Sequence, residues 1–175
     1  SAWGRQLMTG EEAPRVGNEM PMAPVAPCNV YPCKPGGKND YVFIYTSRMP
    51  DSAQWKLLLD VIGRGDLLSD PRFKTPESRY EHRHEIDAII SEWTKRHTKE
   101  EAMRILGSAG VPAGAVLSTM DITNDPYLRK RGTMVTIDHP TRGEMVIPGN
   151  SIKMSASEVP VEPAPLLGQH NEEIY

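Results

Sequence analysis

The sequence predicts an α+β fold: a small, mostly antiparallel sheet from two hairpins, with three to four helices between them. Extended segments separated by turns lie at residues 28–46 and 133–148, and amphipathic helical patterns fill the chain between them. Strands at both ends of a helical stretch are typical of α+β domains. We expect the two hairpins to share one sheet and the helices to cover one of its faces.

Composition indicates an ordinary folded domain. The chain has 175 residues, of which 38% are hydrophobic and 25% charged, so it is long enough to bury a core. A net charge of −3 with interleaved charges offers no basic surface, and we expect no nucleic-acid partner. No run approaches the roughly 20 apolar residues of a membrane-spanning helix, so we expect no membrane partner either.

A proline-interrupted loop at residues 20–27, MPMAPVAP, precedes the first hairpin. Prolines fix φ and remove amide donors, so this loop is stiff and cannot be a helix or an inner strand. The chain is then expected to be extended over residues 28–34, to turn over 35–40 and to form an apolar strand over 41–46. A stiff loop before a hairpin holds its backbone in one place, and this is where we expect a ligand to bind.

The two cysteines, Cys28 and Cys33, lie five residues apart on the same predicted strand and therefore point to opposite faces. This geometry disfavours a disulfide or a shared metal ion. Two reduced thiols favour a cytoplasmic location.

Helical periodicity predicts three buried faces, formed by Trp55, Leu58, Leu59 and Ile62, by Ile86, Ile89, Ile90 and Trp93, and by Ala102, Ile105 and Leu106. Asp51 can cap the first helix, Thr75 followed by proline begins the second, and Thr98 forms a capping box with Glu101 at the third. The charged run 79–85 is interpreted as a solvated face of the second helix.

The remaining chain is predicted from turn residues and alternation. We expect residues 111–116 to be an extended segment of small residues packed closely on a neighbouring backbone, and residues 118–131 to be a broken helix. A hairpin is expected at 133–148, a further short strand at 151–154 and a proline-rich extended tail at 159–165. Residues 1–14 show no periodic pattern and are interpreted as a linker.

Residue spacing gives no complete active site. His82 and His84 lie two residues apart on a predicted helix, so they diverge by roughly 200° and cannot share a metal ion. No set of nucleophile, base and orienting group can be assembled from spacing, and no metal cofactor is expected.

Several segments nevertheless keep the order and spacing of one protein family. They lie at residues 9–10, 14–18, 21–24, 30–34, 70–73, 79, 83, 109–116, 125–126, 131–135, 138–140 and 164–173. Together they resemble the C-terminal part of a family III CoA-transferase, a family that includes formyl-CoA:oxalate and carnitine CoA-transferases and alpha-methylacyl-CoA racemase.

The resemblance implies that the chain is a small-domain portion of a longer enzyme. In the family, a larger N-terminal domain binds most of the CoA and carries a catalytic aspartate, and two subunits interlock as a homodimer. We therefore expect residues 1–14 to be a linker from a missing N-terminal domain, 15–158 a small α+β domain, and 159–175 an extended tail that returns toward the large domain. No residue of this chain is assigned a catalytic function.

Site residues are carried over by position. Met22, Ala23 and Pro24 match the family's loop over the acyl group and are expected to bind substrate. Thr46, Ser47 and Arg48 match positions near CoA, where Arg48 could pair with a phosphate or remain a solvated charge. Transferases that act on formyl and oxalyl groups have a run of glycines in the loop, and prolines here point away from the smallest acyl groups.

The expected function is therefore transfer of CoA from an acyl-CoA to a carboxylic acid, with coenzyme A as part of the substrate. The parent is expected to be the enzyme, through covalent intermediates on an aspartate outside this chain, and the fragment alone is expected to be inactive. Two alternatives remain open: an acyl-CoA racemase of the same family, and a non-catalytic binding or assembly module.

Overall fold

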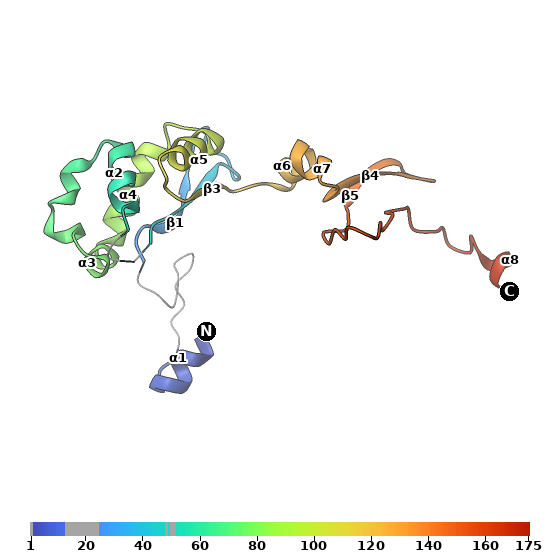
Figure 1. Ribbon diagram of the computed structural model, residues 1–175, viewed down its shortest axis with the longest axis horizontal. Helices are drawn as coiled ribbons and strands as arrows, with labels where there is room; N and C mark the ends of the chain where they lie inside the picture. The colour runs from blue at the N-terminus through green and yellow to red at the C-terminus, as the bar shows by residue number, and fades with distance from the viewer. Residues whose placement is uncertain (1, 13–24, 48, 50–51) are drawn as a thin grey trace. The chain divides into compact units, whose positions relative to one another are not determined.

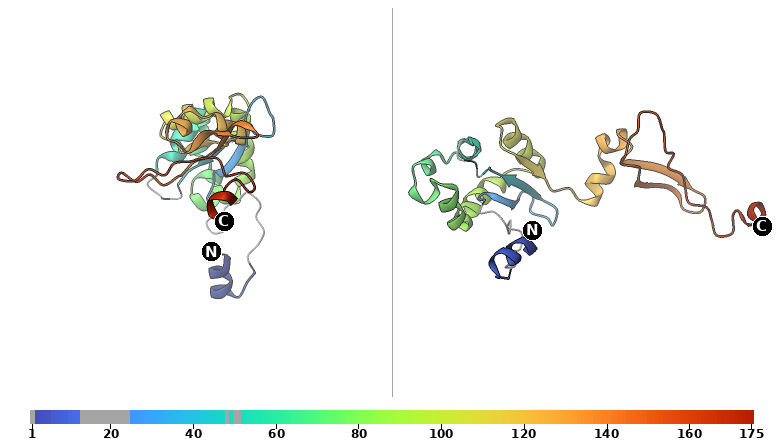
Figure 2. Two further views of the ribbon diagram at one scale, coloured as in Figure 1. Left: turned by 90° about the vertical axis from the view of Figure 1, so that its right-hand side faces the viewer. Right: turned by 60° about the horizontal axis from the view of Figure 1, so that its bottom comes forward.

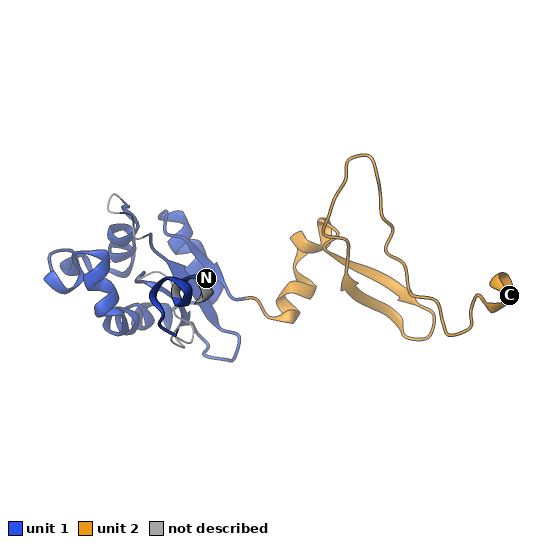
Figure 3. Cartoon of the chain, turned by 90° about the horizontal axis from the view of Figure 1, so that it is seen from below, with its two compact units in different colours: residues 1–116 blue, residues 117–175 orange. Residues whose placement is uncertain are grey.

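The computed structural model describes residues 2–12, 25–47, 49 and 52–175. These residues form two compact units, residues 1–116 and 117–175, which Figure 3 colours separately. The α+β class predicted from the sequence is confirmed, because helices and two small antiparallel sheets are both present.

The first unit contains a three-stranded antiparallel sheet in the order β1 (Cys28–Pro32), β2 (Tyr41–Tyr45) and β3 (Ala113–Ala115). Val42 and Ile44 on β2 are fully buried while Phe43 between them is exposed, which is the alternation of a sheet with one covered face. The small residues of β3 pair directly with Val42, Phe43 and Ile44, so the predicted close packing on a neighbouring backbone is confirmed.

Helices α2 (Gln54–Ile62), α4 (Arg83–Thr94) and α5 (Lys99–Ser108) enclose the core of this unit, and α4 contacts β1 while α5 contacts β2 and β3 (Figure 1). The core includes most of the predicted faces, with Ile89 and Ile105 partly buried at its edge. Gly63, at φ 73°, ends α2.

The helix predicted from Thr75 onward is two helices, α3 (Pro76–Glu81) and α4, divided at His82. Its N-terminal cap is confirmed: Thr75 forms a capping box with Ser78, and Pro76 is the first helical residue. The interpretation of 79–85 as a solvated face is wrong at Arg79, which is only 6% exposed because its guanidinium finds acceptors inside the unit.

Two short 3₁₀ helices, η1 (Gly65–Leu68) and η2 (Pro71–Phe73), connect α2 to α3. Asp70 caps η2 by accepting a hydrogen bond from the Arg72 backbone amide (3.0 Å). This places the Phe73 ring in the core, where it is completely buried.

The capping box predicted at the start of α5 is present. The Thr98 hydroxyl accepts from the Glu101 amide (3.2 Å), and a Glu101 carboxylate oxygen accepts from the Thr98 amide (2.8 Å). The bond from the Thr98 amide is the largest cause that holds the pKa of the Glu101 carboxyl below its usual range, and a bond from the Lys34 side chain is the next.

Replacing Thr98 by alanine is expected to lower the free energy of unfolding by about 1 kcal/mol, since the amide at the third helical position loses its acceptor. Urea denaturation followed by circular dichroism measures this change. Thr98→Ser keeps the oxygen and should stay within about 0.5 kcal/mol of the unchanged protein. Equal losses in both variants would contradict the capping assignment.

The second unit begins with α6 (Thr119–Asn124) and α7 (Pro126–Lys130), which confirm the broken helix restarted at Pro126. A hairpin follows, in which β4 (Met134–His139) pairs with β5 (Gly143–Pro148). In Figure 2 the chain beyond β5 is largely irregular until α8 (Asn171–Ile174).

Two expectations for the sheets are wrong. The hairpins do not share a sheet, because β3 pairs with the edge of β2 that β1 leaves open, and β4 and β5 form a sheet of their own. Residues 151–154 are not a strand; Met154 makes an isolated bridge to Ser157, so the alternation there is not matched by a partner strand.

Residues 2–9, expected to lack regular structure, form helix α1 (Ala2–Thr9). Strong helix formers, among them Gln6, Leu7 and Met8, favour this helix. Gly10, at φ 73°, ends it by donating its amide to the Gln6 carbonyl (2.8 Å).

Candidate functional site

Of the residues predicted from the sequence to bind substrate or CoA, the structure describes Thr46 and Ser47, which directly follow β2. Met22, Ala23, Pro24 and Arg48 lie outside the described residues. Thr46 and Ser47 lie beside residues 25–27, which precede β1, and we call residues 25–27 and 46–47 together the hairpin end.

Thr46 joins the two sides of the hairpin end. Its amide donates to the Pro27 carbonyl (3.0 Å), and its hydroxyl lies 3.5 Å from the carbonyl oxygens of both Ala26 and Pro27. The residue is 1% exposed. Because the hydroxyl is buried against backbone, Thr46 can fix the position of the hairpin end, and a contact with CoA through this hydroxyl is disfavoured.

Ser47 is only half-buried, and its hydrogen bonds go to other partners than those of Thr46. Its amide donates to Oε1 of Gln54, the first residue of α2 (2.6 Å), and its hydroxyl oxygen accepts from the Met49 amide (3.1 Å). Of the two described residues predicted to lie near CoA, Ser47 therefore has the more accessible side chain.

Arg79 approaches the hairpin end from α3. Its Nε donates to the Ala26 carbonyl (3.3 Å), while Nη1 donates to the carbonyl of Phe73 (3.1 Å) and lies 3.5 Å from that of Lys74. The guanidinium carbon is 5.2 Å from the centre of the Trp55 ring, a cation–π distance. Hydrogen bonds from a charged donor contribute about 1.5–3 kcal/mol each, which offsets the cost of burying the charge.

Burial is the main influence on the pKa of Arg79, which it lowers, and Glu77 opposes the shift. An arginine remains protonated under all ordinary conditions, so the charge persists. Among the described residues, the hydrogen-bond acceptors of Arg79 are backbone carbonyls and not a carboxylate.

Sequence reasoning missed Arg79 as a buried residue, although a signal existed. Arg79 lies seven residues before the buried Ile86, one heptad back along the same face of a continuous helical pattern. A charged side chain on an apolar face is a candidate for a specific buried contact.

A second polar cluster connects β1 to α4. Asp87 accepts hydrogen bonds from the Tyr31 hydroxyl (2.5 Å) and from the Asn29 side-chain amide (2.9 Å). Burial raises the pKa of the Tyr31 phenol far above its ordinary value, and the Asp87 charge adds to this shift. Burial, followed by Asp87, also raises the pKa of the Cys28 thiol, which is therefore a poor nucleophile.

The cavity beside this cluster is too small for a substrate. It measures about 10 Å³ and is lined by Val25, Ala26, Cys28, Asn29, Tyr80, Arg83 and Asp87. That volume holds at most one water molecule. The cluster therefore ties α4 to the strand that follows the hairpin end and does not itself form a binding pocket.

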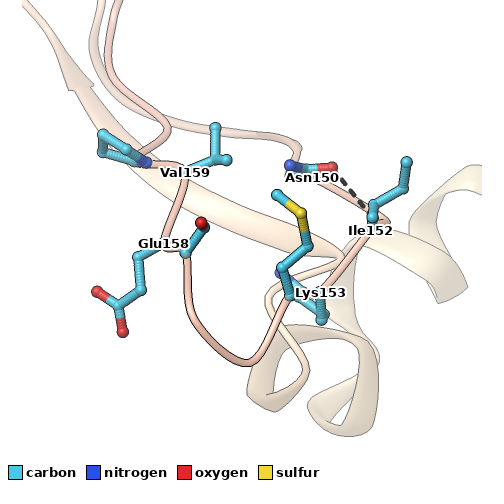
Figure 4. Close-up of a pocket in the computed structure, with 8 residues that line it drawn as sticks. Asn150, Ile152, Lys153, Glu158 and Val159 are labelled. Atoms are coloured by element: carbon cyan, nitrogen blue, oxygen red, sulfur yellow. Dashed lines mark hydrogen bonds between the residues drawn. The ribbon is translucent and has the colours of Figure 1, made fainter.

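The second unit contains a larger hollow of about 530 Å³, shown in Figure 4. Asn150 and Ile152 lie on one side of it, joined by a hydrogen bond from the Ile152 amide to Asn150 Oδ1 (3.0 Å), and Glu158 and Val159 lie on the other. Lys153 donates from Nζ to the Gly132 carbonyl (3.2 Å). All of its lining comes from the single irregular segment 150–160, and we assign it no chemistry.

In the part of the chain that the structure describes, no three His, Cys, Asp or Glu side chains gather in a way that could hold a metal ion. No helix of the described residues has the length and apolar character to cross a membrane.

The sequence model of CoA-transferase family III matches residues 1–171. The chain belongs to this family, and the resemblance found in the sequence is confirmed.

Curated relatives support the same assignment. The chain is 39% identical over 166 residues to formyl-CoA:oxalate CoA-transferase of Streptomyces avermitilis, which covers 95% of this chain and 39% of the relative. It is 37% identical over 174 residues to the enzyme of that name from Rhodopseudomonas palustris (strain HaA2), covering 99% of this chain and 40% of the relative. The chain thus spans about two fifths of the length of these relatives.

Solved structures share the fold. A CAIB/BAIF family protein from Brucella suis superimposes with a TM-score of 0.81 at 26% identity, covering 99% of this chain and 42% of that one. A protein from Mycobacterium tuberculosis superimposes with a TM-score of 0.66 at 20% identity, covering 85% of this chain and 40% of that one.

Proposed function

We propose that this chain is the small-domain part of an enzyme that moves CoA from an acyl-CoA to a carboxylic acid. The observation that carries the proposal is the 39% identity, over 95% of the chain, to a formyl-CoA:oxalate CoA-transferase. The hairpin end supports it, since Thr46, Ala26 and Pro27 hold the predicted CoA-proximal strand end and the entry to β1 together.

The proposal assigns roles by position. Ser47 and Arg48, with the backbone at Thr46, contact CoA, and Met22, Ala23 and Pro24 lie over the acyl group. The covalent chemistry occurs on an aspartate of a larger N-terminal domain, and two subunits interlock in the cytoplasm. Each of these points goes beyond membership of the family.

The direct test is an assay of the complete polypeptide that contains this chain. Formyl-CoA and oxalate are incubated with it, and the CoA esters are separated by liquid chromatography. We expect a new CoA ester only when both an acyl-CoA and a carboxylate are present. A racemase would instead invert an α-carbon of its acyl-CoA without any acceptor, and a non-catalytic module would leave the esters unchanged.

Residues 1–175 alone are expected to transfer no CoA, because the proposed nucleophile lies elsewhere. The measurement is the same chromatographic assay on the purified 175-residue chain, with the complete polypeptide as the positive control. Turnover by the 175-residue chain would show that the nucleophile does not lie outside it.

A second experiment asks which carboxylic acid is the acceptor. The names of the relatives favour formyl and oxalyl groups, while the prolines of residues 20–27 favour a larger acyl group, because they lack the freedom of a glycine loop. Ranking kcat/KM for oxalate against longer mono- and dicarboxylates distinguishes the two. A clear preference for oxalate would show that the proline loop does not exclude small groups.

A further inference from the structure

Arg79 occupies an unusual position for a charged side chain. It is 6% exposed, it lies on a six-residue helix, and it reaches the Ala26 carbonyl, 53 residues earlier in the chain. The same guanidinium donates to the Phe73 carbonyl at the end of η2. One side chain therefore joins the α2–α3 connection to the hairpin end.

Burying a charge is weak support for stability as such, because an apolar side chain of similar volume often does as well. What the guanidinium adds is direction: its donors lie in one plane at fixed angles, and each is aimed at a particular carbonyl. The Trp55 ring, 5.2 Å away, packs against it and restricts its movement. The arrangement fixes where Ala26 lies relative to the helices.

The Ala26 carbonyl is also the point at which Arg79 meets Thr46. It accepts from Arg79 Nε (3.3 Å), and the Thr46 hydroxyl lies 3.5 Å from it. Thr46 is in turn held by its amide on Pro27 (3.0 Å) and is followed directly by Ser47. A displacement of Ala26 is therefore transmitted to the strand end through two residues.

From these contacts we propose that Arg79 is a positioning residue for CoA binding. It contacts no substrate, and it acts by holding the Ala26 carbonyl and, through it, Thr46 and Ser47 in the arrangement that receives CoA. The inference rests on the proposed function, and it concerns a residue on α3 that lies outside the sequence-predicted site.

The first test is hydrogen exchange on the complete polypeptide. In Arg79→Met, the Thr46 amide is expected to exchange at least about tenfold faster, while the Val111 amide, bonded to Leu106 in the same unit, is unchanged. Arg72→Met is the matched control. Arg72 also lies against an aromatic ring, that of Phe73 (5.0 Å), but it is half-exposed and is bonded to the side chains of Asp70 and Glu85. It should leave both amides unchanged.

The second test separates positioning from folding. CoA contacts at the hairpin end stabilise the bound substrate and the transition state alike, so Arg79→Met should raise KM for formyl-CoA about tenfold with kcat within about threefold. A variant that merely unfolds more often loses active enzyme, which lowers the apparent kcat and leaves KM unchanged. Calorimetric titration with CoA itself gives the same comparison without turnover.

Two milder variants keep the test decisive if Arg79→Met does not fold. Arg79→Lys retains the charge and can reach one carbonyl, so it should recover part of the affinity. Thr46→Val removes the hydroxyl that meets Ala26 and should weaken CoA binding in the same direction. Since the two residues share one acceptor, the double variant Arg79→Lys with Thr46→Val should cost less than the product of the two single effects.

The outcomes are distinct. An unchanged Thr46 exchange rate in a folded Arg79 variant, or a fall in kcat with unchanged KM, would overturn the positioning function alone. If the complete polypeptide without substitutions neither binds CoA nor transfers it, the proposed function is wrong, and so is the CoA-binding part of this inference.

Discussion

Replacing Phe73 by alanine is expected to lower the free energy of unfolding by about 3–5 kcal/mol, the usual cost of removing a buried aromatic ring. The ring is completely buried, 6.5 Å from the Trp55 ring and edge-on to His82 at 6.1 Å. Its removal would leave a cavity beneath η2, next to the carbonyl that holds Arg79. Guanidinium denaturation measures the change, and exchange of amides in β1 and β2 reports on the first unit in particular.

The chain contains its own control for this prediction. Phe43, the other of the two phenylalanines, is 39% exposed on β2. Phe43→Ala loses little buried area and should cost about 1 kcal/mol or less, mostly through strand preference. Similar losses at both positions would show that the Phe73 ring does not have the packing described.

The second large effect is expected at Gly149, immediately after β5. A Cβ atom there would lie 2.3 Å from the Gly132 carbonyl oxygen and 3.0 Å from Val135 Cγ1. Backbone atoms cannot yield as a flexible side chain can, so Gly149→Ala should destabilise the hairpin by about 3 kcal/mol, the upper end for overpacking. It should also disturb the bond from the Gly149 amide to the Thr133 carbonyl (2.8 Å).

Hydrogen exchange of the amides in β4 and β5 measures this effect within the second unit. Gly107→Ala is the matched control, because Gly107 lies in helix α5, where an added Cβ would meet no atom within 4 Å outside its own helix and chain neighbours. Alanine is the better helix former there and should stabilise the protein by about 0.5–1 kcal/mol. Unaltered exchange in the Gly149→Ala hairpin would contradict the close approach of residues 132 and 149.

Local patterns explain why much of the fold was predictable. The buried face of α2, the cap at Thr75, the capping box at Thr98 and the broken helix over residues 118–131 each depend on residues a few positions apart. Their physical causes, periodic burial and satisfaction of the first helical amides, act within one or two turns. The same locality explains the family resemblance, which depends on short segments in a constant order.

Apart from helix α1, which local helix formers explain, the main errors concern contacts between distant parts of the chain. Both hairpins were predictable, yet which strands share a sheet depended on β3, whose three small residues fill the open edge of β2. Arg79 was interpreted as solvated because its acceptors on the hairpin end are far away in sequence. The break at His82 was not predicted either, since the sequence around it is compatible with one continuous helix.

Sequence patterns alone were therefore enough to predict the class of fold, the helix starts capped by Thr75 and Thr98, and membership of CoA-transferase family III. The tertiary structure alone decided that there are two separate sheets, that Thr46 faces backbone, and that a buried arginine holds the hairpin end. The reason is physical. Helix caps and apolar periodicity are satisfied by near neighbours, whereas a buried charge is tolerated only where distant carbonyls converge on it.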